Sequence, residues 1–168
     1  MSETTNVMNS EVVKRLLCYV SYDTQSKDES SEVPSTQKQF DLAKVLKKEL
    51  EEIGASDVRL SDHCYVYAKI PSNLESDQKV PAIGFIAHMD TATSLTGKDV
   101  KPQIIKNYDG GVIKLGTSGF SMGPDEFPAL ARLKGKSLIT TDGTTLLGAD
   151  DKAGVAEIMT MASFYLSH

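Results

Sequence analysis

Residues 81–90 read Pro-Ala-Ile-Gly-Phe-Ile-Ala-His-Met-Asp, and the predicted fold is built around this stretch. Ile83 to Ala87 form a short, unbroken apolar run, which is typical of a strand buried on both faces. The run ends abruptly at His88 and Asp90, two side chains that are costly to bury without partners. Ligands bind at the carboxyl ends of strands in open α/β sheets, so these two residues are candidates for a functional site.

His88 and Asp90 are spaced so that they could act together on a metal ion. If the extended backbone continues to Asp90, both side chains point to the same side, because strand side chains repeat every second residue. One imidazole nitrogen would then bind the metal, while the Asp90 carboxylate accepts the N–H of the other nitrogen and fixes the tautomer. A surface histidine beside a turn aspartate is the other interpretation, and these residues alone leave both open.

The composition predicts one soluble globular domain. Of the 168 residues, 40% are hydrophobic and 24% are charged, which is neither a disordered nor a membrane composition. The net charge of −5, without a basic block, argues against nucleic acid and anionic membranes as partners. No apolar run approaches the roughly 20 residues that span a bilayer, and the polar N-terminus has no signal-peptide pattern. The two cysteines form no metal or disulfide spacing, so we expect a cytoplasmic protein.

Helices are predicted where apolar residues recur at helical spacing. After a loose tail over residues 1–9, the first helix is expected from Ser10 to near Tyr22, with Cys18 buried in it. A polar loop follows, and then a helix that is capped by Ser35 or Thr36 and ended by Gly54. The last helix opens near residue 148, with Val155, Ile158, Met159 and Ala162 on its inner face.

Short strands and turns are predicted between these helices. Apolar runs indicate strands over 58–60, 65–70 and 137–140. A small hairpin of 104–105 with 112–115 is expected around Asp109-Gly110-Gly111. Residues 116–125 are expected to be a mobile, glycine-rich loop, and 127–133 a short helix. The predicted fold class is therefore α/β, with a central sheet flanked by helices.

A second acidic cluster, Asp150-Asp151, lies in the run Gly148-Ala149-Asp150-Asp151-Lys152-Ala153-Gly154 at the start of the last helix. Aspartate is favoured at N-caps and in first turns, where it meets the helix dipole, so capping alone could explain the pair. A carboxylate that bridges two divalent cations needs a similar place, on rigid backbone with small neighbours. Both interpretations stand at this point.

Together the two clusters resemble a known family. His88-Met89-Asp90-Thr91 and the run from Leu146 to Gly154 are similar to the dinuclear zinc exopeptidases of the M20 metallopeptidase family, and within it to the aminopeptidases that act on tripeptides. Further matching stretches are 22–26, 33–36, 81–86, 138–143 and 156–160. The resemblance covers most of the chain and favours the metal interpretation.

The resemblance implies a role for each matching residue. His88 would be a terminal ligand of one zinc ion, Asp150 the carboxylate shared by two zinc ions, and Asp90 the residue that orients His88. Asp151 has no ligand role in the family pattern and is expected to cap the helix. Lys152 and Glu157 are expected to be structural or surface residues. The implied reaction is hydrolysis of the peptide bond after the first residue of a short peptide, with a nearby glutamate as general base.

The same resemblance implies that important parts lie outside this sequence. Residues 1–168 would be the N-terminal part of the catalytic domain, ending before the later strands and the lid domain. The Glu-Glu pair with the general base, a further aspartate ligand, a distant histidine ligand and the segment that mediates a homodimer would all come later. With His88 and Asp150 alone, we expect weak metal binding and little or no peptidase activity.

Two alternative interpretations belong to other functional classes. Leu138 to Thr144 resembles the strand-end signature of haloacid-dehalogenase-like phosphatases, but Thr140 stands at the nucleophile position and cannot replace the carboxylate in that chemistry. The stronger alternative is a non-catalytic chain that binds peptide or a partner subunit. Metal-dependent cleavage of a tripeptide would reject that alternative, and zinc-independent peptide binding without turnover would favour it.

Overall fold

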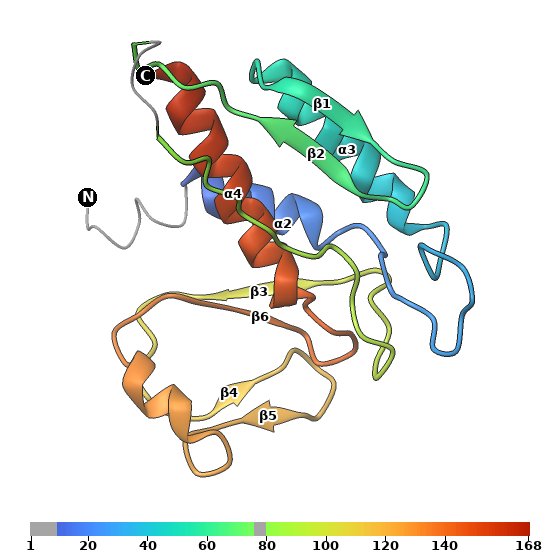
Figure 1. Cartoon of the computed structure of the whole chain (residues 1–168). Coiled ribbons are helices and arrows are strands. Elements are labelled where there is room, and N and C mark those ends of the chain that lie inside the picture. The colour runs from blue at the N-terminus through green and yellow to red at the C-terminus, as the bar shows by residue number, and fades with distance from the viewer. Residues whose placement is uncertain (1–9, 76–79) are drawn as a thin grey trace.

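The computed structural model describes residues 10–75 and 80–168, and the tail expected over 1–9 lies outside the described residues. Its elements form two parts that are stacked one above the other in Figure 1. The upper part holds three helices and a β-hairpin: α2 (Glu11–Tyr19), α3 (Gln39–Glu52), β1 (Ser56–Leu60), β2 (Val66–Lys69) and α4 (Ala149–Ser167). The lower part holds β3 (Pro102–Ile105), β4 (Ile113–Lys114), β5 (Ser121–Met122), the 3-10 helix η1 (Pro128–Leu133) and β6 (Leu138–Thr141).

The main core lies where the three helices of the upper part meet. Apolar side chains at helical spacing face each other there, and the buried ones are Tyr19, Leu42, Leu46, Leu50, Val155, Ala156 and Met159. Full burial of a large aliphatic side chain contributes about 1.5–3 kcal/mol, so this cluster is the main source of stability. Polar groups join the same helices: Arg15 Nε donates to Glu49 Oε1 at 2.6 Å and its Nη1 to Thr160 Oγ1 at 3.2 Å.

Two details of the first helices differ from the prediction. Cys18 is exposed, because its neighbours Tyr19 and Val20 take the inward positions of α2. The second helix begins at Gln39, later than expected, because the hydroxyls of Ser35 and Thr36 are used elsewhere. Ser35 Oγ accepts the Lys27 N–H, and Thr36 Oγ1 donates to the Gln25 carbonyl. Both hydroxyls thus hold the preceding loop and do not cap α3.

The lower part contains a pairing that the sequence analysis did not predict. The expected hairpin of 104–105 with 112–115 is wrong: β3 pairs antiparallel with β6, and β4 pairs with β5 inside the region expected to be a mobile loop. The register places Ile104 opposite Ile139 and Ile105 opposite Leu138. Tyr108 prevents the shorter hairpin, because its N–H donates to the Lys136 carbonyl and its carbonyl accepts the Gly135 N–H.

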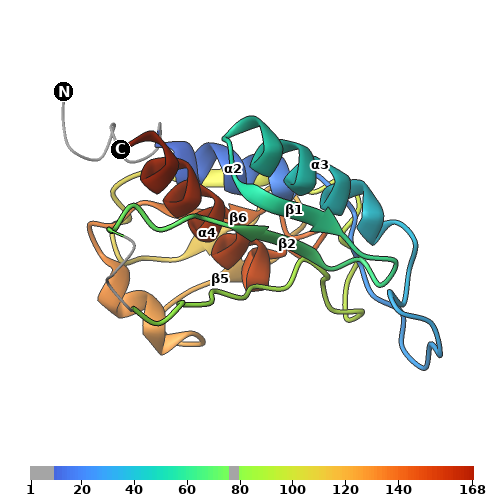
Figure 2. The ribbon, with the colours of Figure 1, turned by 45° about the horizontal axis from the view of Figure 1, so that its top comes forward.

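The apolar run Ile83–Ala87 does not form the buried strand that was predicted. Residues 81–90 have no regular structure, and Figure 2 shows them as an irregular trace that passes α4. Ile83 is 79% exposed and Ile86 is 96% exposed. The sheets among the described residues are three antiparallel pairs, so this segment has no strand beside it and cannot be buried on both faces. The predicted central sheet is therefore absent from the described residues, and the fold is a mixture of helices and small sheets.

Within residues 10–75 and 80–168, no helix has the length and apolar character that crossing a bilayer would require.

Candidate metal centre

His88, Asp90 and Asp150 meet at one place, between the irregular segment and the start of α4. His88 Nε2 lies 3.1 Å from Asp150 Oδ1, although the two residues are 62 positions apart in the sequence. His88 Nδ1 lies 3.0 Å from the backbone oxygen of Asp90 and 3.3 Å from its Oδ1. Both Asp90 atoms are acceptors and favour a proton on Nδ1, while Asp150 Oδ1 is an acceptor that faces Nε2.

The segment after His88 is held by the loop that follows α2. Thr24 Oγ1 donates to the Met89 carbonyl at 2.6 Å, and the Thr91 N–H donates to the Thr24 carbonyl at 3.3 Å. The Thr91 carbonyl in turn accepts the Ser26 N–H at 2.9 Å. These bonds form a short parallel bridge between Gln25 and Thr91. His88 thus sits on an irregular backbone that is nevertheless fixed on its C-terminal side.

Asp150 is placed by an unusual start to α4. Gly148 precedes it with φ +75, and a Cβ at Gly148 would lie 3.0 Å from Thr91 Cγ2. Glycine therefore provides both the left-handed backbone and the close approach to the His88 segment. Asp151 Oδ1 accepts the Gly154 N–H at 3.1 Å, so Asp151 caps the helix, as predicted. The peptide bond between Asp150 and Asp151 is cis.

The geometry of the pair fits a bound cation. Two ligand atoms on one tetrahedral zinc ion are about 3.4 Å apart, given Zn–N and Zn–O distances of about 2.0–2.2 Å. The observed 3.1 Å between His88 Nε2 and Asp150 Oδ1 is close to that value. The Asp150 side chain is 96% exposed, so its second oxygen is also accessible.

Electrostatics point the same way. Burial lowers the pKa of His88, but the acceptors of Asp90 and the Asp150 carboxylate outweigh burial and raise the pKa above its ordinary value. The neighbours of this imidazole therefore favour a positive charge at Nε2. A proton can supply that charge, and a metal ion between Nε2 and Asp150 would supply it in the same place.

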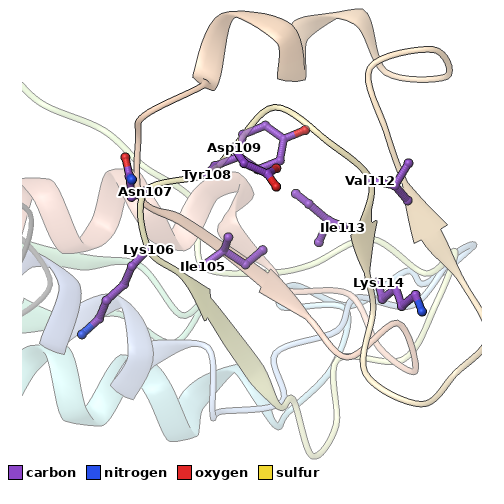
Figure 3. Close-up of a pocket in the computed structure, with 8 residues that line it drawn as sticks. All are labelled: Ile105, Lys106, Asn107, Tyr108, Asp109, Val112, Ile113 and Lys114. Carbon is purple, nitrogen blue, oxygen red and sulfur yellow. The ribbon is translucent and has the colours of Figure 1, made fainter.

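Two cavities of similar size lie on the described surface, and they differ in chemistry. One, of about 320 Å³, is lined by His88 and Asp150 together with Thr91, Ala92, Ser94, Leu146, Gly148 and Ala149. The other, also about 320 Å³, lies between β3 and β4, and Figure 3 shows Ile105, Tyr108 and Ile113 around it. In that second cavity Tyr108 Oη donates to the Gly111 carbonyl and one Asp109 oxygen accepts the Gly111 N–H, so both side chains take part in the bonding of their own loop.

The set of ligands is incomplete within the part of the chain that the structure describes. No three His, Cys, Asp or Glu side chains there are grouped so as to hold a metal ion. His88 and Asp150 provide two, and Asp90 faces the far side of the imidazole. The assignment of these residues as metal ligands stays a prediction.

Lys152, which the sequence analysis left as a structural or surface residue, is only 1% exposed. Its Nζ donates to the Tyr22 carbonyl at 2.7 Å. Burial lowers the pKa of Lys152 to about 8, and the charge of Asp23 opposes this effect. The pattern did contain a signal, because Lys152 lies three and four positions before Val155 and Ala156 on the inner face of α4. Glu157, by contrast, is exposed.

Comparison with known proteins gives relatives that are named Peptidase T. The chain is 57% identical to Peptidase T of Aliivibrio fischeri over 150 residues, which are 89% of this chain and 36% of that protein. It is 51% identical to Peptidase T of Alkaliphilus oremlandii and 52% identical to that of Clostridium acetobutylicum, each over 94% of this chain. The chain matches the N-terminal portion of peptidase T.

The match to peptidase T covers most of this chain but a minor part of each relative. The chain spans 36%, 39% and 38% of the length of these three peptidases. No family model matches the chain. Each of these matches covers 89% or 94% of the chain, so the candidate centre lies within the matched segment, whereas more than half of a peptidase T has no counterpart here.

Proposed function

We propose that this chain carries part of the active site of a metallo-aminopeptidase that releases the N-terminal residue from tripeptides. In this proposal His88 is a terminal ligand of one zinc ion, Asp150 is the carboxylate shared by two zinc ions, and Asp90 orients His88. The approach of His88 Nε2 to within 3.1 Å of Asp150 Oδ1 carries the proposal. The identity of 57% to a protein named Peptidase T supports the choice of reaction.

Each residue has a defined task in the proposed site. Zinc ions bound there would supply an activated water and would polarise the scissile carbonyl. Asp90 would hold the proton on Nδ1 of His88, which would leave the lone pair of Nε2 free for a cation shared with Asp150. Asp150 offers one oxygen beside His88 and a second oxygen on its exposed side. Ala92, Gly148 and Ala149 have small side chains or none, which leaves room for a short peptide in the cavity.

We expect the 168-residue chain by itself to have little or no peptidase activity. A catalytic zinc ion normally has three protein ligands, and the residues around this cavity provide two. The residues that line the cavity also include no glutamate that could act as general base. Binding of zinc, rather than turnover, is therefore the property to measure on this chain.

The test is zinc affinity measured by competition with a chelating dye. We expect His88→Ala and Asp150→Ala each to weaken zinc binding at least about tenfold, since each removes one of two ligands. His63→Ala is the matched control, because His63 is an exposed histidine away from the site. It should leave the affinity unchanged.

Two results would contradict the proposal. Equal zinc affinity in His88→Ala and His63→Ala would mean that zinc binds elsewhere. Peptide binding without turnover that is indifferent to both zinc and chelator would favour a non-catalytic peptide-binding chain instead.

A further inference from the structure

A buried polar cluster links the two segments that carry the proposed ligands. Thr24 is fully buried, Lys152 is 1% exposed and Thr91 is 2% exposed. Polar side chains are seldom buried to this degree unless hydrogen bonds hold them, and Thr24 and Lys152 each donate one, whereas Thr91 Oγ1 has no partner among the described residues. Thr91 lines the cavity of His88 and Asp150, and none of the three belongs to the main apolar core.

The hydrogen bonds of this cluster meet on one short segment, residues 22–24. From the α4 side, Lys152 Nζ donates to the Tyr22 carbonyl at 2.7 Å. From the other side, Thr24 Oγ1 donates to the Met89 carbonyl at 2.6 Å, and the Thr24 carbonyl accepts the Thr91 N–H at 3.3 Å. Residues 22–24 therefore lie between the two segments and are hydrogen-bonded to both. We call these three residues the spacer.

The residues that bond to this spacer are close to the proposed ligands in the sequence. Lys152 is two residues after Asp150, and Met89 is the residue after His88. The bonds from Lys152 and Thr24 hold these two neighbourhoods to the same three residues, so they limit how far His88 and Asp150 can move apart. A methionine side chain would fill a similar volume without the desolvation cost of a buried charge. The ammonium group of Lys152 is therefore costly to bury unless it has a function.

We infer that Lys152 and Thr24 are positioning residues that fix the spacing between His88 and Asp150 for a shared cation. This inference rests on the proposed function, because it assumes that the pair binds zinc. It adds two residues that touch neither the cation nor the peptide. They act through the backbone of residues 22–24.

The test compares Lys152→Met and Thr24→Val with the wild-type chain. The matched controls are Lys48→Met, a lysine whose side chain is 76% exposed, and Thr24→Ser, which keeps the hydroxyl. Two properties are measured on each protein: zinc affinity, and hydrogen exchange of the Thr91 and Ser26 amides. We expect both variants to bind zinc about 10–100-fold more weakly, the range found when groups behind a metal ligand are lost. The two amides should also exchange at least about tenfold faster, while amides of α3 keep their protection.

Each combination of results decides the inference. Weaker zinc binding together with faster amide exchange at Thr91 and Ser26 supports the inference, provided that Thr24→Ser restores both properties. Unchanged zinc affinity in both variants overturns it, even if exchange is faster, because the cluster would then be merely structural. Zinc affinity that falls without faster exchange also overturns it. If His88→Ala leaves zinc affinity unchanged, the proposed function fails and this inference fails with it, a pattern distinct from failure of the inference alone.

Discussion

Asp23 is a carboxylate that its neighbours hold in the charged state. Burial raises the pKa of Asp23, but hydrogen bonds from Lys38 and from the Gln25 N–H outweigh burial, so the pKa lies below its ordinary value. Lys38 Nζ approaches Asp23 Oδ1 to 2.9 Å. A carboxylate with a lowered folded-state pKa stabilises the fold above its unfolded-state pKa, and this stabilisation is lost as the pH falls through the folded-state value.

Asp23→Asn should therefore destabilise the protein in a pH-dependent way. At pH 7 we expect a loss of about 1 kcal/mol in the free energy of unfolding, a value that allows for solvent screening of the partly exposed Lys38. The loss should shrink as the pH falls below about 4 and through the lower pKa of the folded state, because the wild-type carboxylate then takes up a proton as well. Urea unfolding at pH 7 and pH 3 measures both values. Asp57→Asn, which breaks the exposed ion pair with Lys69, is the control and should change little. An equal loss at both pH values for Asp23→Asn would contradict this account.

At the scale of single residues, candidate functional side chains were easier to name from the sequence than the burial of a side chain was to predict. The sequence suggested His88 and Asp90 because an imidazole and a carboxylate at the end of an apolar run are costly unless they have partners, and the family resemblance added Asp150. It did not reveal that Lys152 is buried, because the group that offsets the burial is the Tyr22 carbonyl, 130 positions away. A backbone carbonyl acceptor cannot be recognised from residue types, because every residue has one.

The start of α4 is the element on which the candidate centre depends most. Gly148 has φ +75, and its Cα comes so close to Thr91 that an added Cβ would lie 3.0 Å from Thr91 Cγ2. Gly54, after α3, has a similar φ of +86, but an added Cβ would meet nothing within 4 Å. The two glycines thus share the backbone requirement and differ only in the close approach.

This difference can be measured with Gly148→Ala and Gly54→Ala. Gly54→Ala should cost about 1–2 kcal/mol for the left-handed backbone alone. Gly148→Ala should cost about 1–2 kcal/mol more, because the methyl group crowds Thr91. Only Gly148→Ala should also weaken zinc binding, since it pushes α4 away from the His88 segment. Urea unfolding and zinc titration give both quantities. Equal stability of the two variants would show that the close approach is not a constraint.

At the scale of elements, helices were predicted better than strand pairing. The apolar spacing over 39–52 and 149–167 needs only local information, and both helices are present. Pairing is a long-range property: Ile105 has its partner at Leu138, and not in the nearby run that looked like the other half of a hairpin. The glycine-rich turn expected at 109–111 is present, with Asp109 Oδ1 accepting the Gly111 N–H, but it leads into β4, which pairs with β5.

The whole molecule exposes an apolar surface that a folded domain normally covers. Ile83, Phe85 and Ile86 lie on the irregular segment and are largely exposed. Their run predicts a buried strand, and the described residues contain no strand to pair with it. The chain also spans only 36–39% of its Peptidase T relatives. The central-sheet prediction failed because the described residues place no strand beside residues 83–87. The apolar run itself is present, as the prediction assumed.

We expect this segment to make the isolated chain self-associate. Covering an exposed isoleucine gains about 1.5–3 kcal/mol, and unpaired extended backbone invites pairing with another chain. Ile86→Lys should reduce association, and Val112→Lys, which changes another exposed apolar residue in the lower part, should not. Sedimentation over a range of concentrations measures the mass. A wild-type chain that stays a monomer at all concentrations would contradict the expectation.

The central claim is that one cation binds between His88 and Asp150. The three histidines of the chain, at 63, 88 and 168, allow a direct test by ¹⁵N NMR of the imidazole nitrogens during zinc titration. We predict that Nε2 of His88 shifts at the lowest zinc concentrations, that Nδ1 keeps its proton, and that Asp150→Ala removes the shift. If zinc leaves Nε2 of His88 unperturbed, or perturbs His63 and His168 as strongly, the claim is wrong.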